Sequence, residues 1–554
     1  MISNLKNWWK SGGQWVWLSA GAISVSLIMV FGLLLLIASR GLGYFWPADL
    51  VEFDYKDKNG AIVRLIGEIS SSEQVSTLRL QSAGVDITTD QDYVTRYLLK
   101  AGNRDVTGMD FLAVVEPNIL KQRYPKDLIA MERREWGNFY GYLQSIKGNG
   151  KVIATDAAAR QELDNHVHRA LQLHEKIQRI EKQDIGAINY ALERLRLKQR
   201  GLELTNELTP EKLRNLEKER DKLDNQYKTL RQELSGLYQQ INRDSLTAEV
   251  ADGQSVEIPL SKVVRIYQPN AMSIAKKLSH YFMKLWEFVS DEPREANTEG
   301  GIFPAIFGTV MMVLIMSIMV TPFGVVAAVY LREYAKQGPL TRTIRIAVNN
   351  LAGVPAIVYG VFGLGFFVYF LGGNIDRLFF PESAPAPTFG TPGILWSSLT
   401  LAILTLPVVI IATEEGLTRI PRAIREGSLA LGATKAETLW RIILPMASPA
   451  LMTGMILAVA RAAGEVAPLM LVGVVKLAPS LPMDGNFPYL HMDRKFMHLG
   501  FHIYDVGFQS PNVEAARPLV YATAILLVIV IVTLNLTAIA IRNRLREKYR
   551  TMEN

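Results

Sequence analysis

An arginine and a glutamate stand inside an apolar run of the chain, where ionised side chains are rare. Arg461 and Glu465 lie in the stretch Ala458–Pro468 among small apolar residues. An arginine near the middle of a membrane span costs on the order of 3 kcal/mol, so Arg461 must face a partner or a polar cavity. Glu465 follows four residues later on the same helical face, where the two can pair. Two interpretations stay open: an ion pair that locks a helix bundle, or the charged lining of a route for an anion.

A polar stretch directly precedes this apolar run. Pro421 suits the first turn of a short helix, and Gly432 can end that helix in the left-handed conformation. Thr434 and Glu437 have the spacing of a capping box, which starts another helix. The stretch therefore predicts a helix, a glycine turn and a second helix.

Small residues beside this turn form a low surface that another protein could approach closely. They are Ser428, Ala430, Gly432 and Ala433, and Arg422, Arg425 and Lys435 surround them. After a nine-residue gap follows the motif Ile442-x-Leu444-Pro445. An ordinary basic loop would explain the charge, but it would not explain the small residues together with the spaced motif. We therefore expect a docking segment.

Other residues that could do chemistry give weaker signals. His498 and His502 stand one helical turn apart with His491 nearby, which would suit a metal pair, but their aromatic loop favours no metal site. The only Gly-Lys pair, Gly150-Lys151, has Ser145 where a phosphate-binding loop needs its first glycine. The chain is therefore not expected to hydrolyse ATP itself.

Composition indicates a membrane part joined to a water-soluble part. The 554 residues are 49% hydrophobic yet 20% charged, and the two populations are unevenly distributed. The chain has no cysteine, which excludes disulfides and thiol nucleophiles. Its basic residues do not alternate with aromatic residues as a nucleic-acid surface requires.

Six apolar runs are long enough to cross about 30 Å of hydrocarbon. They cover residues 15–38, 304–331, 346–371, 395–413, 446–474 and 518–541. A signal peptide is the other interpretation of the first run, but its apolar region would be shorter. Lys6 and Lys10 precede the first run, and the 332–345 connection and the tail are also basic, whereas 372–394 is not. This alternation predicts that both termini and the 414–445 loop are cytoplasmic.

Residues 47 to about 300 contain no further span and form an extracytoplasmic insert. Strand-like runs such as Val51–Tyr55 and Ile62–Ile66 predict a β-rich lobe. Between about 155 and 245 the pattern is helical, and one apolar seam repeats at three- and four-residue steps, which predicts an antiparallel coiled-coil hairpin. The hairpin is either a spacer or a docking arm. Residues 271–289 then form an amphipathic helix, with Trp286 and Phe288, at the membrane surface.

Three motifs carry a family resemblance. They are Ala460–Pro468 in the fifth span, Pro355–Gly360 in the third span and Asn297–Gly301 before the second. With the polar stretch, which is similar to the coupling loop of ABC-importer permeases, they resemble the phosphate permeases of the PstA type. The resemblance covers about 297–545 and the first span. It implies a membrane all-α fold of six transmembrane helices with a type I ABC-importer permease core, to which this chain adds an α+β extracytoplasmic insert.

The resemblance also implies roles for single residues. Arg461 and Glu465 match charged residues of the phosphate pathway. The residues matching those that couple to the ATPase are Arg425, Glu426, Gly427, Ser428, Gly432, Thr434, Glu437, Ile442, Leu444 and Pro445. The family usually has Glu-Ala-Ala where this chain has Glu426-Gly427-Ser428, so the size of the residues is kept while their identity differs.

The function that the resemblance implies is transport, not enzyme catalysis. The chain would move inorganic phosphate inward across the cytoplasmic (inner) membrane. Its partners would be a second permease subunit of the PstC type, a cytoplasmic ATPase dimer that binds ATP and Mg, an extracytoplasmic phosphate-binding protein and membrane lipid, and no nucleic acid. No metal or cofactor is expected in the chain itself. Two alternatives stay open: a permease for another oxyanion such as sulfate, and a membrane sensor with a helical extracytoplasmic domain.

The expected domain layout follows from these assignments. Residues 1–46 hold the cytoplasmic N-terminus and first span, and 47–300 the insert. Residues 301–545 form the permease domain with five spans and the 414–445 coupling loop, and 546–554 form a cytoplasmic tail.

Overall fold

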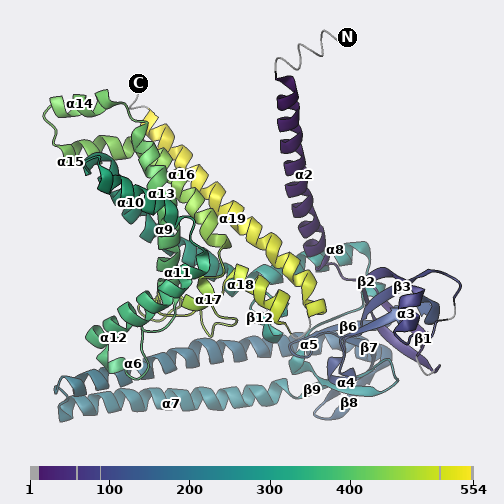
Figure 1. Cartoon of the computed structure of the whole chain (residues 1–554). Coiled ribbons are helices and arrows are strands. Elements are labelled where there is room, and N and C mark those ends of the chain that lie inside the picture. The colour runs from purple at the N-terminus through teal and green to yellow at the C-terminus, as the bar shows by residue number, and fades with distance from the viewer. Residues whose placement is uncertain (1–11, 58–59, 88, 511–512, 551–554) are drawn as a thin grey trace, which may run out of the picture.

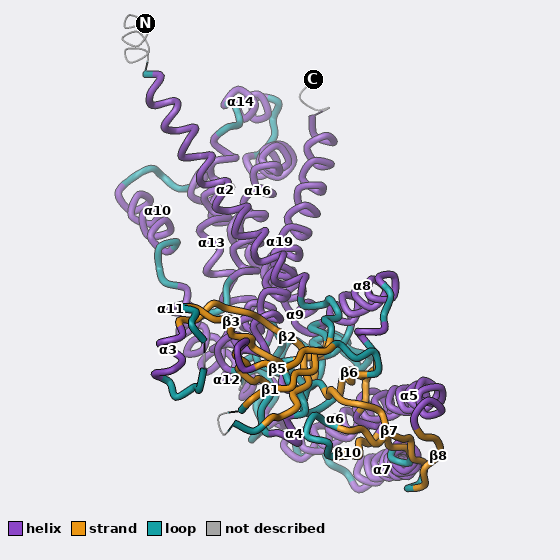
Figure 2. Tube along the Cα trace, turned by 90° about the vertical axis from the view of Figure 1, so that its right-hand side faces the viewer, coloured by secondary structure: helices purple, strands orange, loops and turns teal. Residues whose placement is uncertain are grey.

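The protein combines a bundle of long helices with an insert that holds the strands (Figures 1 and 2). The computed structural model describes residues 12–550 except 58–59, 88 and 511–512. Six helices in this described part are long and apolar enough to cross a membrane: Trp15–Gly43, Phe303–Tyr334, Ala356–Phe379, Ile394–Arg419, Lys435–Gly464 and Ala516–Arg544. The six predicted spans are thus confirmed. Lys6 and Lys10, which contribute to the predicted orientation, lie outside the described residues.

α13 (Ile394–Thr418) is the centre of the bundle. It packs against α9 (Phe303–Val329) on one side and α16 (Leu444–Gly464) on the other, and α16 also packs against α19 (Val513–Arg550). α9 and α13 approach closely, because a Cβ at Gly324 would lie 2.5 Å from Val409. Buried hydroxyl groups on α13 bond back along their own helix, as Thr413 does to the Val409 carbonyl at 2.7 Å.

α2 (Gly13–Gly43) stands apart from the other spans over most of its length (Figure 1). It packs against α19 near its C-terminal end, where a Cβ at Gly41 would lie 2.8 Å from the Tyr521 backbone. Its large apolar side chains from Trp15 to Leu36 are exposed. Such a surface fits a lipid environment.

Two predicted spans begin and end elsewhere. The third was expected at 346–371, but α10 (Pro339–Leu351) is a separate helix, and the span begins after Pro355 with α11 (Ala356–Phe362), η7 (Gly363–Gly372) and α12 (Gly373–Phe379). Proline disfavours the helical conformation of the residue before it, which explains the break. The fifth was expected at 446–474, but its helix covers Lys435–Gly464. Pro445 stands in the first turn of α16, where proline is tolerated.

The strands of the insert form two main sheets, and all their pairings are antiparallel. One sheet has the order β4-β3-β2-β1-β5, and the other has β10-β9-β7-β6-β11 with β8 added beside β7. The first sheet consists of β1 (Leu50–Lys56), β2 (Ile62–Ser76), β3 (Tyr93–Lys100), β4 (Phe111–Val115) and β5 (Ile119–Arg123). The second consists of β6 (Leu128–Arg133), β7 (Phe139–Gly148), β8 (Lys151–Thr155), β9 (Asp244–Glu249), β10 (Ser255–Pro259) and β11 (Val263–Tyr267). Short helices α3 (Thr77–Ser82) and α4 (Arg104–Thr107) connect strands.

A helical hairpin is inserted between β8 and β9. One arm consists of α5 (Asp156–Arg179), the π-helical turn η2 (Ile180–Asp184) and α6 (Ile185–Leu204), and the other arm is α7 (Pro210–Ile241). Pro210 stands in the first turn of α7, and the Thr209 hydroxyl caps the helix by accepting from the Lys212 N–H at 3.3 Å. The apolar seam residues of α7, such as Leu216, Leu230 and Ile241, are buried or half-buried, while most of the residues between them are exposed. Supercoiling of the two arms stays a prediction.

The hairpin lies along the end of the bundle that is opposite α14 (Figure 1). Its arm α6 touches the loop between the last two spans. The Tyr190 hydroxyl donates a hydrogen bond to the Phe487 carbonyl at 2.6 Å, and the Arg194 guanidinium lies over the Phe487 ring at 5.7 Å. The insert and the membrane part are therefore joined at the hairpin as well as at the chain connections.

The chain returns from the insert to the membrane part through α8 (Ile274–Ser290). A two-stranded turn follows, made of β12 (Pro293–Arg294) and β13 (Glu299–Gly300), and then α9 begins.

Candidate functional site

The polar stretch folds as two short helices joined by a glycine. α14 covers Arg422–Ala430 and α15 covers Lys435–Thr438, and Gly432 between them has a φ of +88°. The capping box is present: the Glu437 N–H donates to the Thr434 hydroxyl at 3.2 Å, and the Thr434 N–H donates to the Glu437 carboxylate at 2.9 Å. The predicted helix, glycine turn and helix are confirmed. Pro421 stands at the N-cap of α14, one position before the predicted first turn.

The second of these helices continues directly into the fifth span. After α15, the π-helical turn η9 (Leu439–Ile443) leads into α16 without a break, so that Lys435–Gly464 is one helical span. Leu444 and Pro445 occupy the first turn of α16. A force applied to α15 therefore reaches α16 along a continuous backbone.

Arg425 ties this segment to two other spans. Its guanidinium donates to the carbonyls of Leu417 and Ile420, both at 2.7 Å, at the end of α13. It also forms an ion pair at 3.1 Å with Glu333, in the π-helical turn η6 (Tyr330–Tyr334) that continues α9. Lys435 adds a hydrogen bond to the Glu333 carbonyl and lies over the Tyr334 ring. The segment Arg422–Thr438, called the coupling segment after its family resemblance, thus contacts the ends of α9 and α13 and continues into α16.

The exposed surface of the segment differs from the one expected. Ser428 is buried, and its hydroxyl shares a 2.8 Å hydrogen bond with Thr438, so it joins the two helices and does not belong to a contact surface. Glu426, Gly427 and Gly432 are exposed. The most exposed apolar side chains are Leu431 (91%) and Trp440 (71%), which the sequence reasoning missed. Their apolar character in a polar segment was the available signal.

Arg461 and Glu465 form the predicted pair by a different geometry. Arg461 is in the last turn of α16, and Glu465 is an extended residue just after the helix ends, so the two do not share a helical face. The Arg461 Nε and the Glu465 Oε1 are 3.6 Å apart, and the side chains are 32% and 24% exposed. The prediction that Arg461 lies near the middle of a span is wrong, because Arg461 is in the last turn of a helix that ends at Gly464. The partial exposure leaves both groups able to meet a solute.

The three motifs of the family resemblance meet around the segment that follows Glu465. A Cβ at Gly360, in α11, would lie 2.7 Å from the Cα of Pro468. The Asn297 side chain is buried and donates to the Lys476 carbonyl at 2.7 Å. Segments that are far apart in the sequence therefore fix the chain on the C-terminal side of the Arg461–Glu465 pair.

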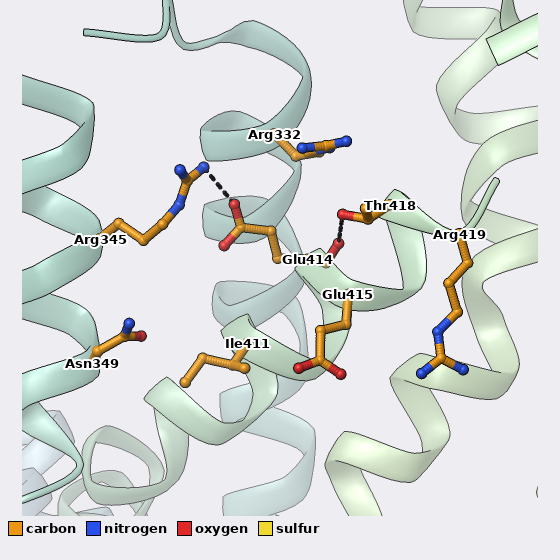
Figure 3. A pocket seen from close by; sticks show the side chains of 8 residues that line it. All are labelled: Arg332, Arg345, Asn349, Ile411, Glu414, Glu415, Thr418 and Arg419. Atoms are coloured by element: carbon orange, nitrogen blue, oxygen red, sulfur yellow. Dashed lines mark hydrogen bonds and ion pairs between the residues drawn. The ribbon is translucent and has the colours of Figure 1, made fainter. Parts of the chain in front are cut away.

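A charged cavity of about 470 Å³ lies between α10, α13 and the end of α9. It is lined by Arg332, Arg345, Asn349, Ile411, Glu414, Glu415, Thr418 and Arg419 (Figure 3). Arg345 and Glu414 point toward each other and pair at 2.5 Å. From the sequence, the basic 332–345 connection served only to predict topology. The two acidic residues at the end of the fourth apolar run, Glu414 and Glu415, were the signal for this charged cavity that the prediction missed. A wall with this many charges is unsuited to lipid and must face water or another protein.

The histidines form no metal centre in the described part of the chain, where no group of three or more His, Cys, Asp or Glu side chains could hold a metal ion. His498 caps α18 (Leu499–Tyr504) and His502 lies within it; both are buried, and burial lowers the pKa of His498 to about 3 and of His502 to about 4. The His498 Nδ1 accepts from the Gly500 N–H at 3.1 Å. Both histidines are therefore neutral packing residues.

Comparisons with known proteins place this arrangement in a family. A family described as "Binding-protein-dependent transport system inner membrane component" matches residues 320–551. The chain is 35% identical over 247 residues to "Phosphate transport system permease protein PstA 1" of Mycobacterium tuberculosis (strain CDC 1551 / Oshkosh), covering 44% of this chain and 71% of the relative. It is 38% identical over 192 residues to "Phosphate transport system permease protein PstA" of Mycobacterium leprae (strain TN), covering 34% of this chain and 57% of the relative.

Among solved structures, the MetNI methionine ABC transporter in an inward-facing conformation aligns with 50% of this chain and 99% of its own, at 18% identity and a TM-score of 0.33. The two mycobacterial permeases each align with less than half of this chain. The match to the Mycobacterium tuberculosis permease covers more than two thirds of that protein at 35% identity, which is enough to assign the family of the membrane part. This chain belongs to the PstA-type permeases, within the inner membrane components of binding-protein-dependent transport systems.

Proposed function

We propose that the chain is the permease subunit of an ATP-driven importer that carries inorganic phosphate into the cell. The observation that carries this proposal is the continuity of one helix, Lys435–Gly464, from the coupling segment to Arg461. The names of the related permeases supply the substrate. The sensor interpretation is not favoured, because those relatives are transport permeases.

The proposed complex contains three kinds of partner. A cytoplasmic ATPase dimer docks on α14 and α15 through the exposed Leu431 and Trp440, and it binds the ATP and Mg. A second permease subunit of the PstC type completes the translocation pathway, and an extracytoplasmic phosphate-binding protein delivers the substrate. The complex resides in the cytoplasmic (inner) membrane with both termini of this chain in the cytoplasm.

Arg461 and Glu465 handle the anion in this proposal. The guanidinium of Arg461 attracts phosphate, and Glu465, at 3.6 Å, competes for the same charge so that phosphate is not trapped. The charged wall around Arg345 and Glu414 faces the partner permease or the pathway, because lipid would not tolerate it.

In this proposal, nucleotide binding shifts the Arg461–Glu465 pair, and the coupling segment transmits the motion. Closure of the ATPase dimer displaces α14 and α15, and the continuous helix and the Arg425 contacts pass this displacement to α16, α13 and α9. The ATPase thereby biases a two-state permease, in which one state opens the Arg461 region outward to receive phosphate.

Uptake by the reconstituted complex tests the proposal. Proteoliposomes containing both permeases, the ATPase and the binding protein should accumulate labelled phosphate when ATP is present on the ATPase side. Sulfate in excess should not compete. Accumulation of sulfate in place of phosphate would show that the chain transports a different oxyanion by the proposed mechanism. If neither anion were taken up when ATP is supplied, the proposal would be overturned.

A further inference from the structure

α8 is held between the ends of two membrane-spanning helices. Phe45, two residues after α2, packs against Phe288 of α8 with ring centroids 5.1 Å apart. The Phe288 carbonyl accepts a hydrogen bond of 2.9 Å from the N–H of Ile302, the residue before α9. Because α2 ends and α9 begins at these contacts, α8 lies at the depth where both spans leave the apolar layer.

One face of α8 packs onto the protein. His280 and Phe288 are buried on this face, and Tyr281 and Leu285 join the same apolar cluster. Lys284 extends from this side to Glu132 of β6 at 2.7 Å. The inward face therefore connects α8 to the second sheet of the insert.

The opposite face of α8 is apolar and exposed. Ile274, Leu278, Phe282 and Trp286 follow one another at four-residue steps, which places them on one side of a helix. Phe282 is 65% exposed and Trp286 is 70% exposed. Residues 271–289 were expected to form an amphipathic helix with Trp286 and Phe288 at the membrane surface; in the structure Trp286 is exposed and Phe288 is buried. Four large apolar side chains on the side away from the core require a cover other than water.

We propose that lipid of the extracytoplasmic leaflet covers this face, and that α8 lies in the boundary between headgroups and acyl chains. α2, whose apolar side chains are exposed along most of its length, ends beside α8 at the contact between Phe45 and Phe288. Trp46, at the end of α2, is 42% exposed and lies 6.1 Å from the Tyr281 ring. Tryptophan and tyrosine at this level are the aromatic residues that membrane interfaces favour.

The position of α8 sets the position of the insert. Lys284 and Arg265 both pair with Glu132, and Arg265 also pairs with Glu287 of α8, so the second sheet is attached to the helix by buried charges. A helix immersed at the boundary fixes the height of this sheet above the membrane.

Single spin labels test the proposal directly, because the chain has no native cysteine. Ala275→Cys and Phe282→Cys place a label on the apolar face, and Ala275→Cys leaves all four large apolar side chains in place. Lys276→Cys, one residue along, places a matched label on the polar flank. Each variant is measured as the full chain in the complete importer complex, in nanodiscs of phosphatidylcholine and phosphatidylglycerol.

Labels on the apolar face should collide severalfold more often with dissolved oxygen than with a water-soluble nickel chelate, and the Lys276 label should show the reverse order. Equal access of the nickel chelate to Ala275, Phe282 and Lys276 labels would place the face in water and overturn the proposal. Labels at Ala275 and Phe282 that are immobilised and shielded from both reagents would show that a protein surface covers the face, which would also overturn it.

Discussion

The carboxylate of Glu333 lies 3.1 Å from the guanidinium of Arg425 and joins the coupling segment to the second membrane span. The same guanidinium donates to two carbonyls at the end of α13. One half-buried side chain therefore holds three helices in register at the end of the bundle where the ATPase is proposed to dock.

Removing this guanidinium should weaken the stimulation of ATP hydrolysis by phosphate. Arg425→Gln leaves the Leu417 and Ile420 carbonyls and Glu333 without their donor, at a cost of about 1.5–3 kcal/mol for each charged hydrogen bond. Phosphate-stimulated ATPase activity in the reconstituted complex should fall severalfold. The control is Arg377→Gln, an exposed arginine on α12 with no charged partner in the described part of the chain. Equal ATPase activity in the two variants would contradict a role for Arg425.

Gly432 should tolerate no bulky side chain. Its φ of +88° is a conformation that costs a β-branched residue about 1–3 kcal/mol. Gly432→Val should therefore misalign α14 and α15 and abolish phosphate stimulation of the ATPase. Gly253→Val is the matched control, because Gly253 also has a positive φ, +84°, and open space around its Cβ position, but lies in the insert. Loss of stimulation in both variants would assign the effect to general instability.

Arg461 should be required for uptake and dispensable for assembly. Arg461→Gln removes the charge that meets phosphate while keeping a side chain of similar length, so uptake should fall below detection while the ATPase and second permease still co-purify. Glu465→Gln, which frees the guanidinium at 3.6 Å, should strengthen phosphate binding and slow its release. Normal uptake by the Arg461→Gln complex would remove this residue from the pathway.

The contact between α11 and the segment after Glu465 should be sensitive to one methyl group. A Cβ at Gly360 would lie 2.7 Å from the Cα of Pro468, so Gly360→Ala forces backbone apart and should cost about 1–3 kcal/mol. The thermal midpoint of the purified chain should drop. Gly365→Ala on η7 meets nothing within 4 Å and should leave the midpoint unchanged. An unchanged midpoint for both variants would show that the two segments separate freely.

Acid should loosen the attachment of α8 to the second sheet. Lys284 and Arg265 hold the pKa of the buried Glu132 at about 2, against the opposing effect of burial. Because the folded pKa is lower than the unfolded one, the stabilisation is complete above about pH 5 and is lost as the pH falls from about 4.5 toward 2. The protection of the β6 amides against hydrogen exchange, corrected for the intrinsic exchange rate at each pH, should fall over that window. Glu132→Gln should exchange faster at neutral pH and show a smaller change with acid; identical pH profiles would contradict the assignment.

The order of elements could be predicted because the responsible signals are local. Six apolar runs, the Thr209 cap and the Thr434–Glu437 box each depend on neighbouring residues, and the structure contains each of them. The strands β10 (Ser255–Pro259) and β11 (Val263–Tyr267) follow the hairpin in sequence and belong to the second sheet, so the hairpin is an insertion within the lobe.

The remaining features depend on contacts between distant segments. The helix of the fifth span ends at Gly464, and the chain after it packs closely against Gly360 at Pro468, a contact that no local pattern reveals. The buried position of Ser428 depends on Thr438, and the charged cavity depends on α10 leaving the third span to meet Glu414. Residue types were sufficient to select Arg461 and Glu465, but only the three-dimensional arrangement gives their actual geometry.

The two ends of the helical hairpin leave the second sheet from opposite edges of the same strand. β8, which leads into α5, and β9, which follows α7, both pair with β7. The strand order of the sheet is thus the same whatever the length of the helices between them. An evolving or engineered chain could shorten, extend or exchange the arm as a module, and so adjust how far it extends along the end of the bundle without refolding the lobe that carries it.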